Sequence, residues 1–267
     1  MTFYSKLQFG IKYLHYWLKA SNGKGHGIHS PFVFDFIKHV LNDHQQHPAY
    51  AKVEKLRSSL IKNQKILQVE DLGAGSHVNP YSQRTISSIV RHAAKPPKYG
   101  QLLYRMAKYY KAKNIIEAGT SLGITTSYLA QANADASIVT LEGASEVADQ
   151  AINNFKDLQL NNIKLIKGDF NETLSVALQE WSQVDLVFID GNHQKHPTIN
   201  YFKQLLDHIH NNTILIFDDI HWSPGMEEAW ELIRVNENVT ATIDLFFIGI
   251  VFFRKEIKNK QHFMIRF

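Results

Sequence analysis

Residues 114–123 read Asn-Ile-Ile-Glu-Ala-Gly-Thr-Ser-Leu-Gly, and this stretch decides the fold. Its apolar first half predicts a short buried strand, and its two glycines predict a tight turn into a helix that begins near Thr125. A second strand is expected at 137–141, and Glu142 follows it, 19 residues after Gly123. A strand, a glycine turn, a helix and an acidic residue about 20 residues further on form the arrangement that holds a nucleotide ribose in α/β proteins.

Beyond residue 97, short apolar segments alternate with amphipathic ones. The apolar segments predict strands at 114–118, 137–141, 163–166, 184–189, 213–217, 239–245 and 248–254. The amphipathic segments predict helices at 100–110, 125–133, 145–159, 172–180, 196–210 and 226–235. This alternation predicts an α/β fold with a doubly wound, mostly parallel, seven-stranded sheet. Because only a short turn separates the last two strands, we expect them to pair antiparallel.

The first 95 residues follow another pattern and predict an N-terminal helical extension. Apolar residues recur on one helical face at Phe3, Leu7, Ile11, Leu14 and Leu18. Ser30 and Pro31 predict the N-cap and first turn of a second helix through Leu41. Further helices are expected at 45–68 and 85–94, separated by a loop at 71–81. We therefore predict two regions, a helical one at 1–95 and an α/β domain at 96–267.

Composition narrows the function classes. The chain has 267 residues and no cysteine, which excludes disulfide scaffolds, zinc–cysteine sites and thiol catalysis. The formal net charge of +4 is unevenly spread: residues 1–110 carry 16 Lys and Arg against 5 Asp and Glu, and residues 111–267 carry 13 against 20. Lysines interrupt the apolar residues at the N-terminus, so we expect neither a secretory signal nor a transmembrane segment. We expect a cytoplasmic protein.

Two glycine loops compete for the role of cofactor loop. The loop at 71–76 runs into Pro80, which obstructs a following helix, and no strand with an acidic residue follows at the required distance. The loop at 117–123 meets each requirement. It lacks the middle glycine that lets a backbone approach a pyrophosphate, which favours S-adenosylmethionine over a dinucleotide because that cofactor has no pyrophosphate.

Acidic residues follow the predicted strands. Asp169 follows the third, Asp190 ends the fourth, and Asp218 and Asp219 end the fifth. Together with Glu142 they mark the carboxyl ends of neighbouring strands, where open α/β sheets bind their ligands. A sulfonium cofactor and a divalent cation can both use such carboxylates, whereas a dinucleotide oxidoreductase needs no such group.

The sequence resembles the class I S-adenosylmethionine-dependent methyltransferases, especially the small-molecule O-methyltransferases of the catechol and caffeoyl-CoA type. The segments at 100–114 and 117–123 are similar to the leading helix and first motif of that family. Asp190 matches the aspartate at the end of strand four, and 216–222 resembles the Asp-Asn pair with a following tryptophan. The resemblance covers about residues 97–255.

The resemblance implies roles for individual residues. The implied S-adenosylmethionine-binding residues are Glu117, Gly119, Thr120, Ser121, Gly123, Thr125, Glu142, Asp169 and Asp190. The implied ligands of a divalent cation, Mg²⁺ or Ca²⁺, are Asp190, Asp218 and Asp219. His193 stands at the position of the family's catalytic lysine and becomes the expected general base, with Lys195 as its alternative. Asp219 replaces the family's asparagine and adds a negative charge.

The expected reaction is methyl transfer to a hydroxyl of a small molecule. Two alternatives remain open: methylation of RNA or protein recruited by the basic N-terminal region, and a cofactor-binding module without catalysis. The N-terminal helices are expected to cover the active site, while their charge also suits an RNA, an anionic membrane surface or an acidic substrate. A homodimer is a further possibility, and the acceptor is not specified by the sequence.

Overall fold

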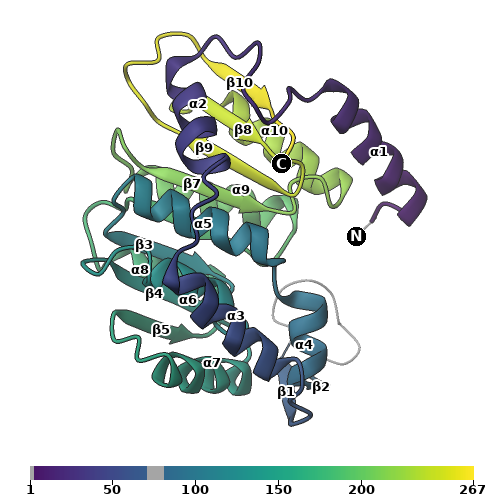
Figure 1. Cartoon of the computed structure of the whole chain (residues 1–267), viewed down its shortest axis with the longest axis vertical. Coiled ribbons are helices and arrows are strands. Elements are labelled where there is room, and N and C mark those ends of the chain that lie inside the picture. The colour runs from purple at the N-terminus through teal and green to yellow at the C-terminus, as the bar shows by residue number, and fades with distance from the viewer. Residues whose placement is uncertain (1–2, 71–80) are drawn as a thin grey trace. The chain divides into compact units, whose positions relative to one another are not determined.

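A computed structural model describes residues 3–70 and 81–267 of the chain (Figure 1). It contains two compact units: Met1–Asp43 with Ser182–Phe267 form the first unit, and His44–Trp181 form the second. The rejected glycine loop at 71–76 and most of the predicted loop at 71–81 lie outside the described residues.

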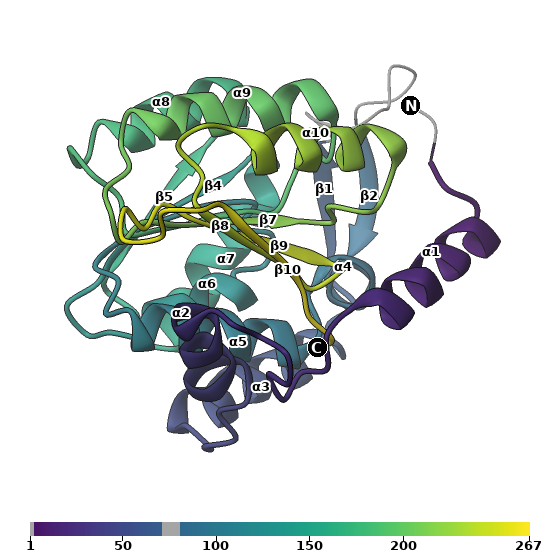
Figure 2. The ribbon, with the colours of Figure 1, turned by 90° about the horizontal axis from the view of Figure 1, so that it is seen from above.

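The second unit is an α/β body with an added hairpin. Its strands are β1 (Ile66–Glu70), β2 (Tyr81–Thr85), β3 (Asn114–Ala118), β4 (Ser137–Glu142) and β5 (Ile163–Lys167). Its helices are α3 (Pro48–Leu60), α4 (Ile86–Ala93), α5 (Pro97–Tyr109), α6 (Ile124–Ala130), α7 (Ser145–Asp157) and α8 (Phe170–Leu178). Strands β3, β4 and β5 pair parallel in that order, and β1 pairs antiparallel with β2. Figure 2 shows α8 on one side of β4 and β5, with α5, α6 and α7 on the other.

The first unit has a mixed sheet. Its strands are β6 (Leu186–Ile189), β7 (Ile214–Asp218), β8 (Ala241–Asp244), β9 (Ile248–Phe252) and β10 (Gln261–Met264). Its helices are α1 (Lys6–Lys19), α2 (Pro31–Phe36), the π-helical segment η1 (Ile37–Leu41), α9 (Lys195–Leu206) and α10 (Pro224–Val235). The strand order is β10-β8-β9-β7-β6, in which β9 alone runs antiparallel to its neighbours. In Figure 2, α9 and α10 lie on one side of these strands and α2 on the other.

Most of the predicted elements are confirmed. The strands and helices beyond residue 97 form an α/β fold of mostly parallel strands flanked by helices, and the pairing of β8 with β9 is antiparallel. The buried strands β6, β7 and β9 consist almost entirely of apolar residues, because helices cover both of their faces. Ser30 caps α2 as predicted by accepting a hydrogen bond from the amide of Val33.

Two local predictions were wrong. The helix expected at 45–68 ends at Leu60, and the residues from Ile66 onward form β1 of a hairpin. The strand β10 was not predicted; it adds an eighth strand to the described part of the chain beyond residue 97 and pairs parallel with β8. Its sequence, Gln-His-Phe-Met, is short and lacks the β-branched residues that mark strands.

Among the described helices, none is long and apolar enough to cross a membrane.

Candidate functional site

The glycine loop is fixed to the neighbouring strand of the second unit. Strands β3 and β4 run parallel with Ala118 opposite Leu141, so the loop leaves β3 beside the end of β4. The amides of Gly119 and Thr120 both donate to the carbonyl of Leu141, each at 3.0 Å. The Thr120 hydroxyl donates to the same carbonyl at 3.0 Å. These contacts give the loop one conformation before any ligand is present.

Gly123 is required by both backbone and packing. It has φ +76°, in the left-handed region that favours glycine, and it is the N-cap of α6. A Cβ atom at this position would lie 2.3 Å from the ring of Phe155 on α7. Thr125, in the first turn of α6, is buried. The second glycine therefore allows α6 to start close to α7, which is a packing role as well as a loop role.

Glu142 ends β4 and turns back onto the glycine loop. Its Oε2 accepts a hydrogen bond of 2.7 Å from the amide of Ser121, and its Oε1 accepts one of 2.9 Å from the amide of Ala144. Burial raises the pKa of the Glu142 carboxyl, and the hydrogen bonds from backbone amides oppose that shift. Each carboxylate oxygen has a second lone pair that can accept a further hydrogen bond.

Glu117 lies deeper than the sequence suggested. Its side chain is fully buried, and its Oε2 accepts hydrogen bonds from the hydroxyls of Thr126 and Thr140, the latter at 2.7 Å. The Thr140 hydroxyl also contacts that of Thr120 at 2.6 Å. Sequence reasoning missed both Thr126 and Thr140. Thr140 interrupts an otherwise apolar strand, and a lone hydroxyl in such a strand is the signal that could have identified it.

Asp169 begins the helix that follows β5. Its side chain accepts hydrogen bonds from the amide of Asn171 at 2.7 Å and from the Asn171 side chain at 2.8 Å, so it acts as the N-cap of α8. An aspartate at this place stabilises the helix N-terminus whether or not a ligand binds. The adenine contact that the resemblance implies stays a prediction.

A second group of candidate residues gathers in the first unit. Strands β6 and β7 pair parallel with Ile189 opposite Phe217, so Asp190 and Asp218 leave the sheet side by side. One ligand atom each from Asp190, His193 and Asp218 lies within 4.8 Å of the others. Asp218 is buried, whereas the other two are partly exposed. Two carboxylates and an imidazole in this arrangement can hold one divalent cation.

His193 lies between carboxylates. Its Nε2 is 3.8 Å from Oδ1 of Asp190 and 4.0 Å from Oδ2 of Asp219. Asp219 has φ +52°, and it is not among the three converging residues, although the sequence predicted it as a ligand in place of His193. The structure therefore brings together two of the three predicted ligands, and adds the predicted base to them.

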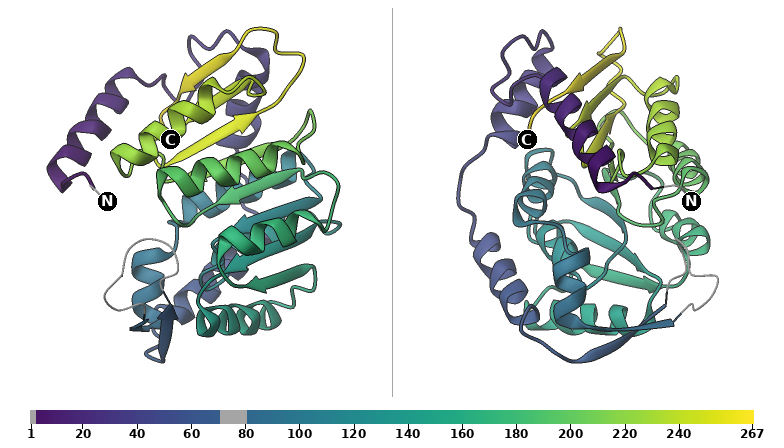
Figure 3. Two further views of the ribbon diagram at one scale, coloured as in Figure 1. Left: turned by 180° about the vertical axis from the view of Figure 1, so that it is seen from behind. Right: turned by 90° about the vertical axis from the view of Figure 1, so that its right-hand side faces the viewer.

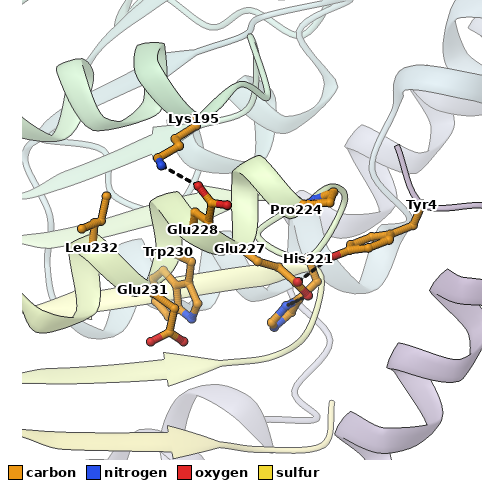
Figure 4. A pocket seen from close by; sticks show the side chains of 9 residues that line it. All are labelled: Tyr4, Lys195, His221, Pro224, Glu227, Glu228, Trp230, Glu231 and Leu232. Atoms are coloured by element: carbon orange, nitrogen blue, oxygen red, sulfur yellow. Dashed lines mark hydrogen bonds and ion pairs between the residues drawn. The ribbon is translucent and has the colours of Figure 1, made fainter. Parts of the chain in front are cut away.

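Charged contacts continue beyond β7 and were not predicted. Nδ1 of His221 lies 3.0 Å from Oε1 of Glu227, and its Nε2 lies 2.8 Å from Oδ2 of Asp244. Lys12 Nζ on α1 donates to Glu227 at 2.9 Å. The hydroxyl of Tyr4, which precedes α1, donates to the same carboxylate at 2.6 Å (Figure 4). This set of five residues, the His221 network, joins segments that lie far apart in the sequence.

The His221 network has shifted pKa values. Burial alone would lower the pKa of His221, but the hydrogen bonds to Asp244 and Glu227 raise it to about 9. Burial would raise the pKa of Glu227, but hydrogen bonds from His221, Tyr4 and Lys12 lower it to about 2. At neutral pH His221 therefore carries a positive charge and Glu227 a negative one.

A surface pocket of about 670 Å³ adjoins this network. Tyr4, His221 and Glu227 line it together with residues of α10, and Lys195 closes one side (Figure 4). Lys195 forms an ion pair with Glu228, which lies on α10. Lys195 was the alternative general base, and this pairing engages its amine with a carboxylate outside the predicted site. None of the other residues predicted for the site lines the pocket.

The region that contains these candidate residues is similar to known proteins. Residues 116–220 match a family model described as a methyltransferase domain. They include both the glycine loop and the Asp190–His193–Asp218 group. A solved O-methyltransferase from Bacillus cereus, in complex with SAH, has the same fold, with a TM-score of 0.55 at 19% identity over 79% of this chain and 93% of that one.

Two curated relatives are similar in sequence. A tRNA (guanine-N(7)-)-methyltransferase from Mycoplasma mobile is 32% identical over 100 residues, which are 36% of this chain and 49% of that protein. A catechol O-methyltransferase from Niastella koreensis is 28% identical over 127 residues, which are 46% of this chain and 57% of that protein. The chain thus matches about half the length of each relative.

The chain has the fold of the solved O-methyltransferase from Bacillus cereus, which confirms the predicted architecture of mostly parallel strands flanked by helices. Residues 116–220, less than half of the chain, are similar to the methyltransferase domain family. The predicted resemblance to catechol-type and caffeoyl-CoA-type enzymes agrees with the relative from Niastella koreensis.

Proposed function

We propose that the protein is an S-adenosylmethionine-dependent methyltransferase that transfers a methyl group to a hydroxyl oxygen of a small molecule. The observation that carries this proposal is the position of Glu142 at the end of β4, bonded to the amide of Ser121 in the glycine loop. The carboxylate is thereby presented beside the loop, where it can accept hydrogen bonds from the two hydroxyls of a ribose.

The glycine loop would bind the cofactor with little rearrangement. Its backbone is already held by Leu141, and Gly119, with φ +113°, leaves no side chain between that backbone and a ligand. Glu117 would act indirectly, because it accepts a hydrogen bond from Thr140, whose hydroxyl contacts that of Thr120 in the loop. The predicted contact of Asp169 with adenine belongs to the same proposal. Several of the similar solved structures, among them the one from Bacillus cereus, contain SAH or SAM.

The Asp190–His193–Asp218 group fits a divalent cation. Its atoms converge within 4.8 Å, and carboxylate with imidazole is a donor set suited to Mn²⁺ or Fe²⁺ as well as Mg²⁺. A bound cation would lower the pKa of an acceptor hydroxyl. Asp190 and Asp218 would hold it, whereas Asp219, the third ligand that the resemblance implies, is not part of the converging group.

In this mechanism the chain's residues prepare the acceptor oxygen. Nε2 of His193 would accept the proton of the acceptor hydroxyl, and the cofactor, when bound, would supply the methyl group for that oxygen and leave as S-adenosylhomocysteine. Imidazole is the side chain that most often serves as a general acid or base in enzymes.

Calorimetry with S-adenosylhomocysteine tests the cofactor site. We expect Glu142→Ala to weaken binding by about tenfold to a hundredfold, because two charge-assisted hydrogen bonds are lost. Glu172→Ala, which removes an exposed carboxylate from α8 of the same unit, is the matched control and should leave binding unchanged. Equal affinity for the wild-type protein and Glu142→Ala would refute this assignment of the loop.

A substrate comparison tests the acceptor class. The purified protein is incubated with labelled S-adenosylmethionine and either a panel of phenols and catechols or unmodified tRNA. Methylated phenol, detected by mass spectrometry, supports the proposal. Labelled tRNA supports the alternative suggested by the relative from Mycoplasma mobile and by the basic N-terminal region. Cofactor binding without methylation of either supports a module that has lost catalysis.

The role of His193 is tested by two substitutions. Lysine at this position restores the residue of the resembled family, so His193→Lys should retain activity and move its pH optimum upward, whereas His193→Gln should lose it. Calorimetry with Mn²⁺ provides the second measurement. If His193→Gln weakens Mn²⁺ binding as strongly as Asp190→Asn does, the imidazole is a ligand and the assignment as base is wrong.

A further inference from the structure

The first helix of the protein has two contrasting faces. One face of α1 carries Tyr16, which is buried and whose hydroxyl donates to the carbonyls of Asp244 and Ile265. Phe9 lies on the same face and contacts the rings of Trp222 and Phe246, with centroids 5.8 Å and 5.2 Å away. This face packs on the first unit.

Charged contacts hold the same helix in place. Lys12 forms an ion pair with Glu227, and the Tyr4 hydroxyl donates to the same carboxylate. At the other end of α1, the guanidinium of Arg266 lies 4.1 Å from the ring centroid of Trp17. Because both ends are anchored, the orientation of α1 on its own unit is fixed, and so is the direction in which its second face points.

The second face of α1 is apolar and exposed. Leu7, Leu14 and Leu18 are 74%, 55% and 62% exposed, and Ile11 is 47% exposed. Their spacings of four, three and four residues place them in one stripe along the helix. Phe3, which precedes the helix, is 50% exposed and its ring contacts that of Trp222. Figures 1 and 3 show the helix projecting beyond the strands β8 and β10 of the same unit.

The charges near this stripe have a single sign. Residues 3–30 contain four lysines and neither aspartate nor glutamate. Lys6 and Lys19 are exposed on α1, and Lys24 is exposed just beyond its end. Trp17, 45% exposed, lies beside the apolar stripe and has the amphipathic ring that suits a membrane interface. An apolar stripe bordered by lysines is typical of helices that lie in a membrane surface.

We propose that the exposed face of α1 binds the surface of an anionic lipid bilayer. The leucines would enter the boundary between headgroups and acyl chains, while Lys6, Lys19 and Lys24 would contact lipid phosphates. Charge complementarity favours this occupant over a second copy of the chain, because two α1 helices would bring lysines together with no acidic residue to pair with them. RNA would meet leucines where it needs polar and basic groups. The proposal concerns a surface separate from the methyl-transfer site.

Vesicle binding tests the proposal with the full chain. The protein is mixed with vesicles of phosphatidylcholine alone or with added phosphatidylglycerol, and binding is measured by co-sedimentation and by the fluorescence shift of its tryptophans. We expect binding to the anionic vesicles only. The double variant Leu7→Ser with Leu14→Ser should weaken it by about tenfold or more. Lys6→Gln with Lys19→Gln should weaken it by about fivefold per lysine.

Control variants distinguish vesicle binding through the exposed face of α1 from nonspecific hydrophobic binding. Ile66 and Val176 are 56% and 46% exposed in the other unit, and the double variant Ile66→Ser with Val176→Ser should bind as the wild-type protein does. Raising the salt to about 1 M, where the Debye length is about 3 Å, should release the protein only if the lysines contribute. Circular dichroism of each variant shows that α1 is still folded.

Two outcomes would overturn the proposal. One is the absence of binding to anionic vesicles at low salt, or equal binding to neutral ones. The other is a dimer, seen by sedimentation velocity, that Leu7→Ser with Leu14→Ser dissociates, since the stripe would then be an interface between copies. S-adenosylhomocysteine affinity, measured in the same preparations, reports on the methyltransferase site and should be unchanged in each α1 variant.

Discussion

In the glycine loop of the second unit, carboxylates accept hydrogen bonds from uncharged donors, whereas beyond β7 of the first unit carboxylates pair with charged ones. Glu117 is held by two threonine hydroxyls and Glu142 by two backbone amides. Glu227, in contrast, meets the ammonium of Lys12 and the imidazole of His221. Both regions thus position carboxylates, but by different means.

Hydrogen bonds from neutral donors and ion pairs respond differently to salt and pH. Hydroxyls and amides carry no charge, so we expect the contacts of the glycine loop to depend little on salt. Ion pairs weaken as salt rises or as either partner loses its charge. The comparison teaches that the cofactor loop is preorganised by neutral contacts, whereas the placement of α1 depends on charge.

The strongest test of the preorganised loop is Gly123→Ala. The new Cβ would overlap the ring of Phe155, 2.3 Å away, and the residue would keep a positive φ. We expect a loss of about 3 kcal/mol or more in the free energy of unfolding, because overpacking and left-handed strain add. Thermal unfolding measures it. Gly10→Ala on α1, where nothing lies within 4 Å, is the control and should be neutral or stabilising.

The threonine contacts of Glu117 are tested by Thr140→Val. Valine keeps the shape of the side chain and removes the hydroxyl that donates to the buried carboxylate at 2.7 Å. We expect a loss of about 2 kcal/mol in unfolding free energy, the cost of leaving a buried carboxylate with one donor fewer. Thr240→Val on the other unit, part-buried and bonded only to the carbonyl of Phe252, should lose less. An equal loss in both would show that Glu117 does not need Thr140.

The cation site is tested by comparing two neighbouring aspartates. Asp218 belongs to the converging group and Asp219 does not. We therefore expect Asp218→Asn to weaken Mn²⁺ binding by about tenfold or more, and Asp219→Asn to weaken it only slightly, as measured by calorimetry. If the two variants weaken binding equally, the ligand set is the one that the family resemblance implied.

Much of the fold follows from local pattern. The strands β3, β4, β6 and β7 are apolar runs between turn signals, and their alternation with helices dictates parallel pairing. The strand β10 and the hairpin partner β1 could not be recognised in the same way. Both depend on a neighbouring strand elsewhere in the chain to complete their backbone hydrogen bonds, and neither has a strong apolar pattern.

The candidate site was predictable only where chain position determines it. Glu142 and Asp190 follow strands, so counting along the sequence located them. The contribution of His193 depends on the backbone turn through Asn192, with φ +49°, which directs its imidazole toward Asp190 and Asp219. His221 meets Asp244 across 23 residues and Glu227 across six, and no spacing rule anticipates that pairing.

The smallest expected effect is the pH dependence of the His221 network. Glu227 has its pKa lowered to about 2 in the folded protein, so its contribution to holding α1 is present above its ordinary pKa of 4.5 and is lost as pH falls toward about 2. His221 has its pKa raised to about 9, so its contribution is complete below its ordinary value of 6.5 and is lost as pH rises through about 9. The network is therefore strongest between these two ordinary values.

Hydrogen exchange measures this window. Protection of the α1 amides should decline from pH 6.5 towards about 9, while protection of the glycine-loop amides should not. Glu227→Gln should lower the protection of α1 at neutral pH by about 1 kcal/mol, because the ion pairs with Lys12 and His221 are lost and the Tyr4 hydrogen bond can remain. Glu228→Gln, which removes only the exposed pair with Lys195, should leave α1 unchanged. Equal protection of α1 in all three proteins would mean that its aromatic contacts alone hold it and that charge is dispensable there.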